Sequence, residues 1–343
     1  MKIQINTPSR IHGTLLDLEG SIGRIDGGIG FTLAHPNWDI EIESIDEPSV
    51  ILESPPQVDE QSTRSLINDI IANLGIGSLQ SGVKITIKDY IQDHVGLGSK
   101  TQLCLALADG ISRLFNVKGV PFEKEKLAKI VRRGGTSGIG VTSYFQGGFI
   151  IDGGHSFGKG LEKPTFLPSS ASNACPPPVL VREDMPGKWR IVCAIPSDTK
   201  GAHDAEEVNI FQEYCPIPLN EVEKLCHLLL MKLLPAIKLG EFNTVCSCIN
   251  AIQGIGFKKI EVDLRGTNFK KLMKEWSDAG APCVGMSSFG PLIYSLARSE
   301  EEALELKEKI DKIMNFSKVS SFITRFSNSG AKIKISGENE VEE

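Results

Sequence analysis

A glycine-punctuated turn followed at once by an amphipathic helix is the first candidate for chemistry in this sequence. It reads DHVGLGSKTQLCLALADGI, from Asp93 to Ile111. Glycine lets a backbone approach an anion closely, and the start of a helix presents free N–H groups with roughly half a positive charge. The stretch has neither the Walker spacing nor a dinucleotide fingerprint. It predicts an anion-binding loop or, on a simpler interpretation, a helix cap after a tight turn; the candidate ligands are Gly96, Gly98, Ser99, Lys100, Thr101 and Gln102.

Three further loops combine glycines with cations or hydroxyl groups. Residues 8–30 hold Arg10, His12, Asp17, Arg24 and Asp26; RRGGTSGIGVTS (132–143) holds Arg133, Thr136 and Ser137; GMSSFGP (285–291) holds Gly285, Ser287 and Ser288. Each loop alone could be an ordinary turn. Four such loops in one chain, with cations in or beside three of them, favour a site for a multiply phosphorylated ligand.

Composition excludes several classes of protein. The 343 residues carry a net charge of −6, which gives no support to a nucleic-acid partner. No run of about 18 apolar residues is present, so we expect no membrane span. The first residues lack the apolar core of a signal peptide, and the eight scattered cysteines show no zinc spacing. We therefore expect a cytoplasmic protein with reduced, mostly buried cysteines.

Strands and helices mix without strict alternation, which predicts an α+β protein. Alternating residues predict strands at the first residues, at 38–45 and at 82–91, and apolar stripes predict helices after Ser62, after Ser99 and over 219–240. A final hairpin is predicted to turn at 328–330. The predicted organisation is an N-terminal domain (1–160), a Pro- and Ser-rich connecting loop (161–186), a C-terminal domain (187–336) and a disordered acidic tail (337–343).

The four loops, taken in order, resemble a known family. GLGSKTQLCLAL is similar to the second motif of the GHMP kinase superfamily, PSRIHGTLLDL to its first motif and GMSSFGP to its third. Together with RRGGTSGIGV and GGFIIDGGH, they resemble the β-ribofuranosylaminobenzene 5′-phosphate synthases of archaeal methanopterin biosynthesis. The resemblance implies a ribosomal S5 domain 2-like N-terminal domain, a ferredoxin-like C-terminal domain, a site between them and a homodimer. Lys100 departs from the family pattern, where a small residue is expected.

The same loops bear on whether the chain is a kinase. Kinases of the superfamily often carry a loop of the type PSGID, whose aspartate orients or deprotonates the substrate hydroxyl. Here the stretch is TSGIG, and Gly140 stands in place of the acid. Glycine can do neither task, although some superfamily members also lack this aspartate. The sequence therefore argues against a small-molecule kinase, which remains the alternative interpretation.

The reaction implied by the resemblance is a decarboxylating phosphoribosyl transfer. The substrates are 5-phosphoribosyl 1-diphosphate and either 4-aminobenzoate or 4-hydroxybenzoate, and the products include CO2 and diphosphate. The ring carbon that bears the carboxylate attacks the anomeric carbon, and loss of CO2 takes the place of proton loss. Such chemistry requires neutralisation of diphosphate, for which we expect Mg2+ and the helix start in the opening stretch.

The individual residues have alternative roles. We expect Arg10 and Arg24 to bind phosphate, although surface ion pairs would also suit them. Asp17 and Asp26 would bind Mg2+ or ribose hydroxyls, or serve in turns. Lys100 would contact phosphate or lie in solvent. Further candidates are Arg133, Thr136 and Ser137 for a carboxylate or phosphate, Ser287 and Ser288 next to Gly285 for the floor of the site, His12, His155, and the cluster of His203, Asp204, Glu206 and Glu207, of which Glu206 is a metal candidate. A third class of function is a ligand-binding regulator without turnover.

Overall fold

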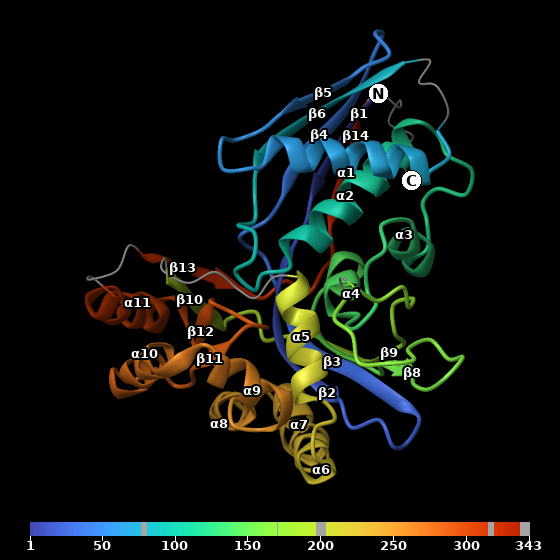
Figure 1. Cartoon of the computed structure of the whole chain (residues 1–343). Helices are drawn as coiled ribbons and strands as arrows, with labels where there is room; N and C mark the ends of the chain where they lie inside the picture. Colours follow the sequence, from blue (N-terminus) through green and yellow to red (C-terminus); the bar gives the residue numbers. More distant parts are fainter. Residues whose placement is uncertain (77–80, 170, 197–203, 315–318, 337–343) are drawn as a thin grey trace.

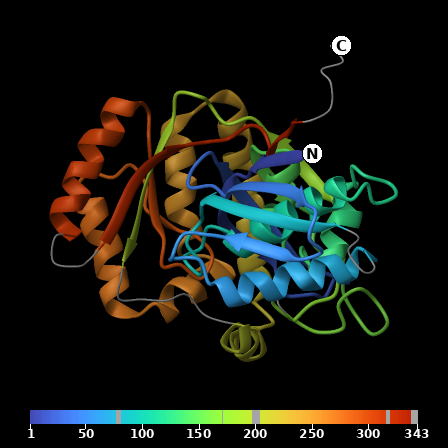
Figure 2. The same ribbon diagram turned by 90° about the horizontal axis from the view of Figure 1, so that it is seen from above.

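The computed structural model describes residues 1–76, 81–169, 171–196, 204–314 and 319–336. Three β-sheets and the helices around them give an α+β architecture, as predicted. Figure 1 shows one sheet in the upper part of the molecule, with the two others and most helices below it. Seen from above, the orange and red helices lie to one side of the blue strands (Figure 2).

The three central strands of the upper sheet have residues that alternate between buried and half-exposed. Its order is β14 (Lys332–Ser336), β1 (Lys2–Asn6), β4 (Asp39–Ile45), β6 (Gly82–Asp89) and β5 (Val50–Glu53). Ile3, Ile5, Ile40 and Ile42 are fully buried because they share the face that α1 (Glu60–Asn73) and α2 (Ser99–Leu114) cover. This packing fixes where the first residues of α2 lie.

The second sheet carries the first motif. Its order is β2 (Ser9–Asp17), β3 (Arg24–Leu33), β7 (Phe149–Asp152) and β9 (Val179–Glu183), and β8 (His155–Ser156) pairs with β3. The register of β2 against β3 shifts between His12 and Thr14. Such a bulge re-aims side chains locally. The short helix α4 (Ile139–Phe145) packs against this sheet, and α3 (Lys124–Ile130) packs against α4 and α2 (Figure 1).

The third sheet forms the C-terminal part. Its order is β11 (Gly285–Met286), β12 (Ile293–Ala297), β10 (Arg190–Pro196) and β13 (Val319–Arg325), all antiparallel. Val192 and Ala194 face one apolar cluster together with α10 (Gly266–Asp278) and α11 (Glu300–Met314). The alternate residues Ile191 and Cys193 belong to the main core, which also contains Phe31. The first and last parts of the chain therefore share one continuous core.

The remaining helices surround the lower sheets. They are α5 (Asp204–Tyr214), α6 (Leu219–Leu228), α7 (Leu234–Leu239), α8 (Phe242–Ile252) and α9 (Gly256–Leu264). The predicted helix over 219–240 is confirmed, but a π-helical turn (Leu229–Leu233) joins α6 to α7 immediately before Pro235, which has no N–H to donate. Among the helices that the structure describes, none has the length and apolar character needed to cross a bilayer.

Two sequence-based expectations, the final hairpin and the strand-free connecting loop, were wrong. β13 and β14 do not form a hairpin, because β13 pairs with β10 while β14 pairs with β1 and completes the upper sheet. The predicted connecting loop 161–186 contains β9, whose backbone satisfies the open edge of β7. The predicted tail, 337–343, lies outside the described residues.

Gly30 lies where β3 packs most closely against its neighbours. A methyl carbon on Gly30 would lie 2.4 Å from a side-chain carbon of Ile139 and 2.5 Å from the Ile11 carbonyl oxygen. We predict that Gly30→Ala lowers the free energy of unfolding by about 1–3 kcal/mol. Gly254→Ala is the control, because its nearest atom would be 3.8 Å away. Equal denaturant midpoints for the two variants would contradict this packing.

Candidate active site

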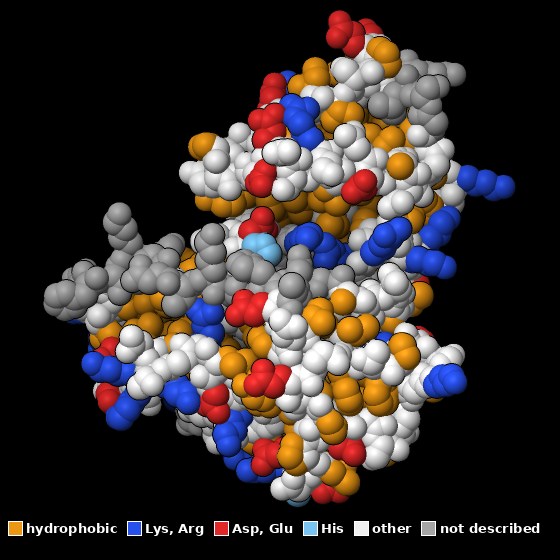
Figure 3. Space-filling model, in the orientation of Figure 1, with side chains coloured by type: hydrophobic (Ala, Val, Ile, Leu, Met, Phe, Trp, Pro, Cys, Tyr) orange, Lys and Arg blue, Asp and Glu red, His pale blue; other side chains and the backbone are white. Residues whose placement is uncertain are grey.

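A cleft opens where the four glycine-containing loops meet. Figure 3 shows a hollow between the upper and lower parts of the molecule, with Lys, Arg and His side chains beside it. Two adjoining parts make up the cleft and share several lining residues, among them Arg10, Thr101, Arg133 and Ser288. We call the part beside the start of α2 the anion part; it is further lined by Asp93, His94, Gly96, Gly98, Ser99, Lys100 and Gly290. We call the other the inner part; it is further lined by His12, Leu15, Thr136, Ser137, Gly140, Phe211 and Glu261.

The opening stretch forms the predicted turn and helix start. Gly98 has a left-handed backbone, with φ of 77°, and no side chain caps the first N–H groups of α2. Ser99 is buried, and its hydroxyl donates to the Ile91 carbonyl, so this side chain holds the turn in place. Lys100 is exposed on the rim of the cleft, while Thr101 lines both of its parts. The backbone donors of the helix start therefore face the cleft without a protein partner supplied by a side chain.

Arg10 is the cation that lies directly beside this turn. Its guanidinium donates to the Gly96 carbonyl, and its own backbone N–H donates to the Leu97 carbonyl at 3.1 Å. A methyl carbon on Gly98 would lie 3.1 Å from the Arg10 side chain, so the glycine makes room for the arginine. Burial lowers the pKa of Arg10 to about 10, opposed by the charges of Glu207 and Glu261, which leaves the group charged at neutral pH.

The third motif closes the turn from the other side. The Ser287 hydroxyl donates to the Gly96 carbonyl at 2.6 Å and accepts from the His12 backbone N–H at 3.0 Å. Ser288, with a left-handed φ of 51°, donates its N–H to the His12 carbonyl and lines the cleft. Gly285 is required because a methyl carbon there would lie 2.4 Å from the Tyr294 ring. Ser287 and Gly285 thus shape the floor without lining the cleft.

The RRGGTSGIG loop supplies the opposite wall. Arg133, Thr136, Ser137 and Gly140 line the inner part of the cleft. The Nε atom of Arg133 is buried and has no hydrogen-bond partner among the described residues. Gly140 lies in the first turn of α4, and its carbonyl accepts from the Gln102 side-chain amide at 2.7 Å. This hydrogen bond joins the first turn of α2 to the first turn of α4.

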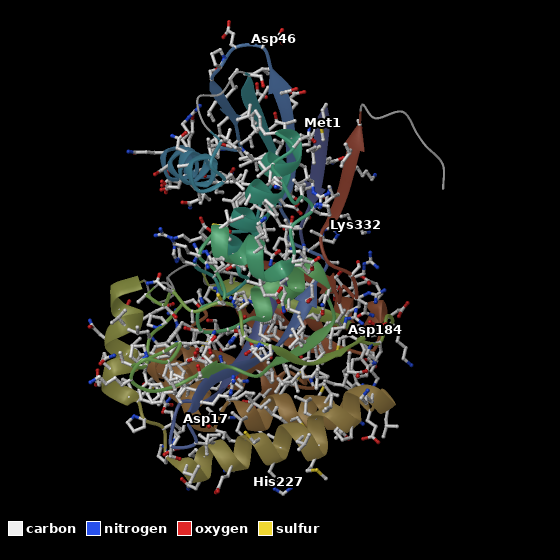
Figure 4. The ribbon with its side chains drawn as sticks, turned by 90° about the vertical axis from the view of Figure 1, so that its right-hand side faces the viewer. Met1, Asp17, Asp46, Asp184, His227 and Lys332 are labelled. Carbon is white, nitrogen blue, oxygen red and sulfur yellow. The ribbon has the colours of Figure 1, made fainter. Side chains whose placement is uncertain are left out.

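Three of the predicted acids and cations have structural duties. Asp26 is buried, with Lys163 Nζ at 2.9 Å and His155 Nδ1 at 2.7 Å, and Lys163 also donates to Thr136. Asp17 accepts from the backbone of Glu19 and Gly20, and it lies toward α6 (Figure 4). Arg24 donates to the carbonyls of Gly153 and Gly154. Asp17, Arg24 and Asp26 are all absent from the cleft lining.

A buried ion pair that no sequence pattern indicated lies beside the floor of the cleft. Lys258 and Glu261 of α9 pair with each other, and Lys258 donates to the Ser288 carbonyl at 3.1 Å. Burial raises the pKa of Glu261 and lowers that of Lys258, while each partner's charge acts in the opposite direction. In the sequence both residues look like surface charges of an amphipathic helix. The one local indication that this part of the helix is buried is the neighbouring Phe257.

His12 lies among positive charges. Burial, followed by the charges of Arg10 and Lys258, holds the pKa of His12 well below its usual range, so the imidazole is neutral. It lines the inner part of the cleft, and its Nδ1 atom has no partner among the described residues. Leu15, Phe211 and Phe289 form an apolar wall nearby, and all three belong to one buried cluster.

Carboxylates are scarce around the cleft. Asp93, Glu207 and Glu261 line it, whereas Glu206 is exposed on α5 and His203 lies outside the described residues. Within the described ranges, no group of three or more His, Cys, Asp or Glu side chains is placed to hold a metal ion. A protein-built metal cage therefore does not fit these residues. A Mg2+ ion held mainly by phosphate oxygens and water needs one or two carboxylates, and Asp93 and Glu207, which line the anion part, would be the residues to supply them.

Comparison with known proteins decides the family. Residues 64–148 match the GHMP kinases N terminal domain. The beta-ribofuranosylphenol 5′-phosphate synthase of Methanothermobacter thermautotrophicus is 45% identical over 299 residues, covering 86% of this chain and 89% of that protein. The protein of the same name from Methanocaldococcus jannaschii is 42% identical over 339 residues, covering 96% and 99%. The chain belongs to this family.

Several solved structures that resemble the chain are small-molecule kinases. Homoserine kinase from Cytophaga hutchinsonii has a TM-score of 0.62 at 15% identity, covering 97% of both chains. L. major mevalonate kinase in complex with R-mevalonate has a TM-score of 0.66 at 12% identity, covering 94% and 96%. At these identities the likeness shows the fold alone. The predicted GHMP kinase-like α+β fold is confirmed, and the kinase interpretation has support only from the fold.

The buried Asp26–Lys163 pair gives a test of its structural duty. We predict that Asp26→Asn lowers the free energy of unfolding by about 3–5 kcal/mol, because Lys163 is left buried without its counter-charge. The double variant Asp26→Asn/Lys163→Met should recover more than half of that loss, with Lys163→Met alone completing the cycle. Denaturant unfolding measures all three. An Asp26→Asn variant with unchanged stability and no activity would instead give Asp26 a direct catalytic role.

Proposed function

We propose that this chain transfers a phosphoribosyl group from 5-phosphoribosyl 1-diphosphate to the ring of 4-hydroxybenzoate, with release of CO2 and diphosphate. Membership of the beta-ribofuranosylphenol 5′-phosphate synthase family supports the class of reaction. The relatives' name also favours one acid over the other. Loss of the carboxylate from 4-hydroxybenzoate leaves a phenol, whereas 4-aminobenzoate would leave an aniline.

The observation that carries this proposal is the position of Arg10 beside the start of α2. A departing diphosphate develops negative charge, and preorganised donors aimed at that charge are the most effective form of stabilisation. The guanidinium of Arg10, the backbone N–H groups at Ser99–Thr101 and the rim cation Lys100 all face the same part of the cleft. We assign the diphosphate to this anion part.

The inner part of the cleft suits the aromatic acid. Leu15, Phe211 and Phe289 offer apolar surface for a ring, and Arg133 offers a guanidinium to the carboxylate before it leaves as CO2. With diphosphate at the start of α2, the ribose would lie between Arg10 and this wall. The ring carbon that bears the carboxylate would then face the anomeric carbon.

The absence of an acid at Gly140 accords with this reaction. A kinase substrate hydroxyl must be oriented or deprotonated during transfer, whereas this nucleophile is a ring carbon with no proton to lose. A methyl carbon on Gly140 would already lie 3.2 Å from Thr101. A longer acidic side chain at this position would therefore compete with the helix start for space in the cleft.

Three finer points complete the proposal. Mg2+ would enter with the diphosphate and neutralise its charge, and Asp93 and Glu207, the carboxylates that line the anion part, would complete its shell. The protein is a homodimer, as expected of the family, which sedimentation would test. It works in the cytoplasm, where its phosphorylated substrate is made.

The reaction gives the first test. With phosphoribosyl diphosphate, Mg2+ and carboxyl-labelled 4-hydroxybenzoate, we predict equal amounts of labelled CO2 and diphosphate, and less of both with 4-aminobenzoate. The matched control replaces phosphoribosyl diphosphate by ATP and a panel of alcohols. ATP consumption without CO2 release from either acid would favour a kinase. Ligand binding without any turnover would favour a regulator.

Arg10 gives the second test. We predict that Arg10→Lys lowers kcat about 100-fold or more, because a lysine cannot keep the Gly96 contact and also present a fork to the diphosphate. Arg64→Lys is the matched control, since Arg64 pairs with Glu60 on the surface of α1. Steady-state kinetics with phosphoribosyl diphosphate measure the effect. Equal rates for the two variants would remove Arg10 from the site.

A further inference from the structure

Three polar side-chain atoms converge on one glycine at the inner end of the cleft. The position that a methyl carbon would take on Gly28 lies 3.0 Å from Ser137 Oγ, 3.2 Å from His12 Nε2 and 3.4 Å from Asp152 Oδ2. The three atoms come from β2, β7 and the loop before α4. We call them the Gly28 cluster. Gly28 has an ordinary strand conformation, so its backbone does not require glycine. Its lack of a side chain instead leaves room for the three polar atoms.

Two members of the Gly28 cluster line the cleft. His12 and Ser137 both border its inner part. The neutral imidazole of His12 can accept a hydrogen bond at one nitrogen and donate one at the other. Ser137 Oγ lies 3.4 Å from Asp152 Oδ2 and can donate to it, and it accepts from the Ile139 N–H at 3.3 Å, which leaves one lone pair for a ligand. The pair therefore offers both an acceptor and a relay to whatever group reaches the end of the cleft.

Asp152 stands behind Ser137 and has no role in the reaction as described so far. It is completely buried, and its Oδ2 accepts from the Gly138 N–H at 2.9 Å while its Oδ1 accepts from the Gly154 N–H at 3.2 Å. Burial raises its pKa to about 7, against the two backbone hydrogen bonds. A buried carboxyl beside a substrate cleft costs stability, so a functional duty is a reasonable expectation.

The Gly28 cluster borders a part of the cleft that the turn before α2 does not line. His12 and Ser137 border only the inner part, and Gly98 and Lys100 border only the anion part. In the proposed reaction the carboxylate-bearing carbon meets the ribose. The substituent in the para position then points away from the diphosphate, along the wall formed by Leu15 and Phe211 and toward the Gly28 cluster.

We propose that the Gly28 cluster binds the para hydroxyl of the aromatic substrate, with His12 and Ser137 in contact with it and Asp152 as the positioning residue behind them. This inference rests on the proposed function. It identifies a specificity site for the aromatic acid, in a part of the cleft that the diphosphate does not reach.

The cluster would also manage the hydroxyl proton. As the ring carbon bonds to the anomeric carbon, the hydroxyl oxygen pushes electrons into the ring and passes its proton through Ser137 to the Asp152 carboxylate. The diphosphate leaves with the electron pair of its bond to ribose. The electrons of the bond to CO2 then restore the aromatic ring, and the phenolate regains the proton from Asp152. No net proton is consumed.

Gly28→Ala tests the cluster directly. The added methyl presses on all three polar atoms, and we predict a KM for 4-hydroxybenzoate raised about tenfold or more, with the KM for phosphoribosyl diphosphate unchanged. Inhibition by benzoate, which lacks the hydroxyl, should change less than about twofold. Ser137→Ala adds no bulk and should show the same pattern. Gly254→Ala is the control, because its methyl meets nothing closer than 3.8 Å.

Asp152→Asn separates positioning from packing. It keeps the shape but cannot take the proton, so we predict a fall in kcat with 4-hydroxybenzoate of about tenfold or more and little change in benzoate inhibition. Equal losses for benzoate and 4-hydroxybenzoate, or none in Gly28→Ala and Ser137→Ala, would overturn the inference. A raised KM for phosphoribosyl diphosphate alone would also overturn it. If the wild-type protein releases no CO2, the proposed function itself fails.

Discussion

The carbonyl of Gly96 is the point on which the site depends. It accepts from the guanidinium of Arg10 and from the hydroxyl of Ser287, so three loops from distant parts of the chain meet at one oxygen atom. The left-handed turns at Gly96 and Gly98 are what bring that oxygen and the start of α2 to the same side. Without this junction Arg10 would not be held beside the helix start, and the loop that forms the floor of the cleft would lose its contact with the turn.

A kinase-like scaffold can carry different chemistry once its charges are placed differently. The relatives in sequence are synthases, whereas several similar solved structures are kinases at 12–15% identity. The cleft presents cations and backbone donors at one end, an apolar wall along its side and a glycine where an acid would serve a hydroxyl. That arrangement suits the proposed departure of an anion, and the fold alone would not have distinguished this reaction from phosphoryl transfer.

The parts of the site that lie close in sequence were predictable, and the parts joined across the chain were not. The glycines and hydroxyl residues around Thr101, Ser137 and Ser288 predicted the loops that line the cleft. The hydrogen bond from Ser287 to Gly96 spans 191 residues, so no local pattern showed that Ser287 builds the floor. The pairing of Asp26 with Lys163 spans 137 residues, so no local pattern showed that this carboxylate lies outside the cleft lining. Similarly, the chain does bend at the predicted turn, 328–330, but the following strand, β14, pairs with the edge of β1 and not with β13.

The position of the diphosphate is the most direct test of the account. A crystal structure of the protein with phosphoribosyl diphosphate and unreactive benzoate should show the two phosphates of the leaving group on the N–H groups of residues 99–101 and on Arg10. The benzoate ring should then lie against Phe211 and Phe289. Diphosphate bound elsewhere, with a nucleotide base filling the inner part of the cleft in a parallel soak with ATP, would contradict it.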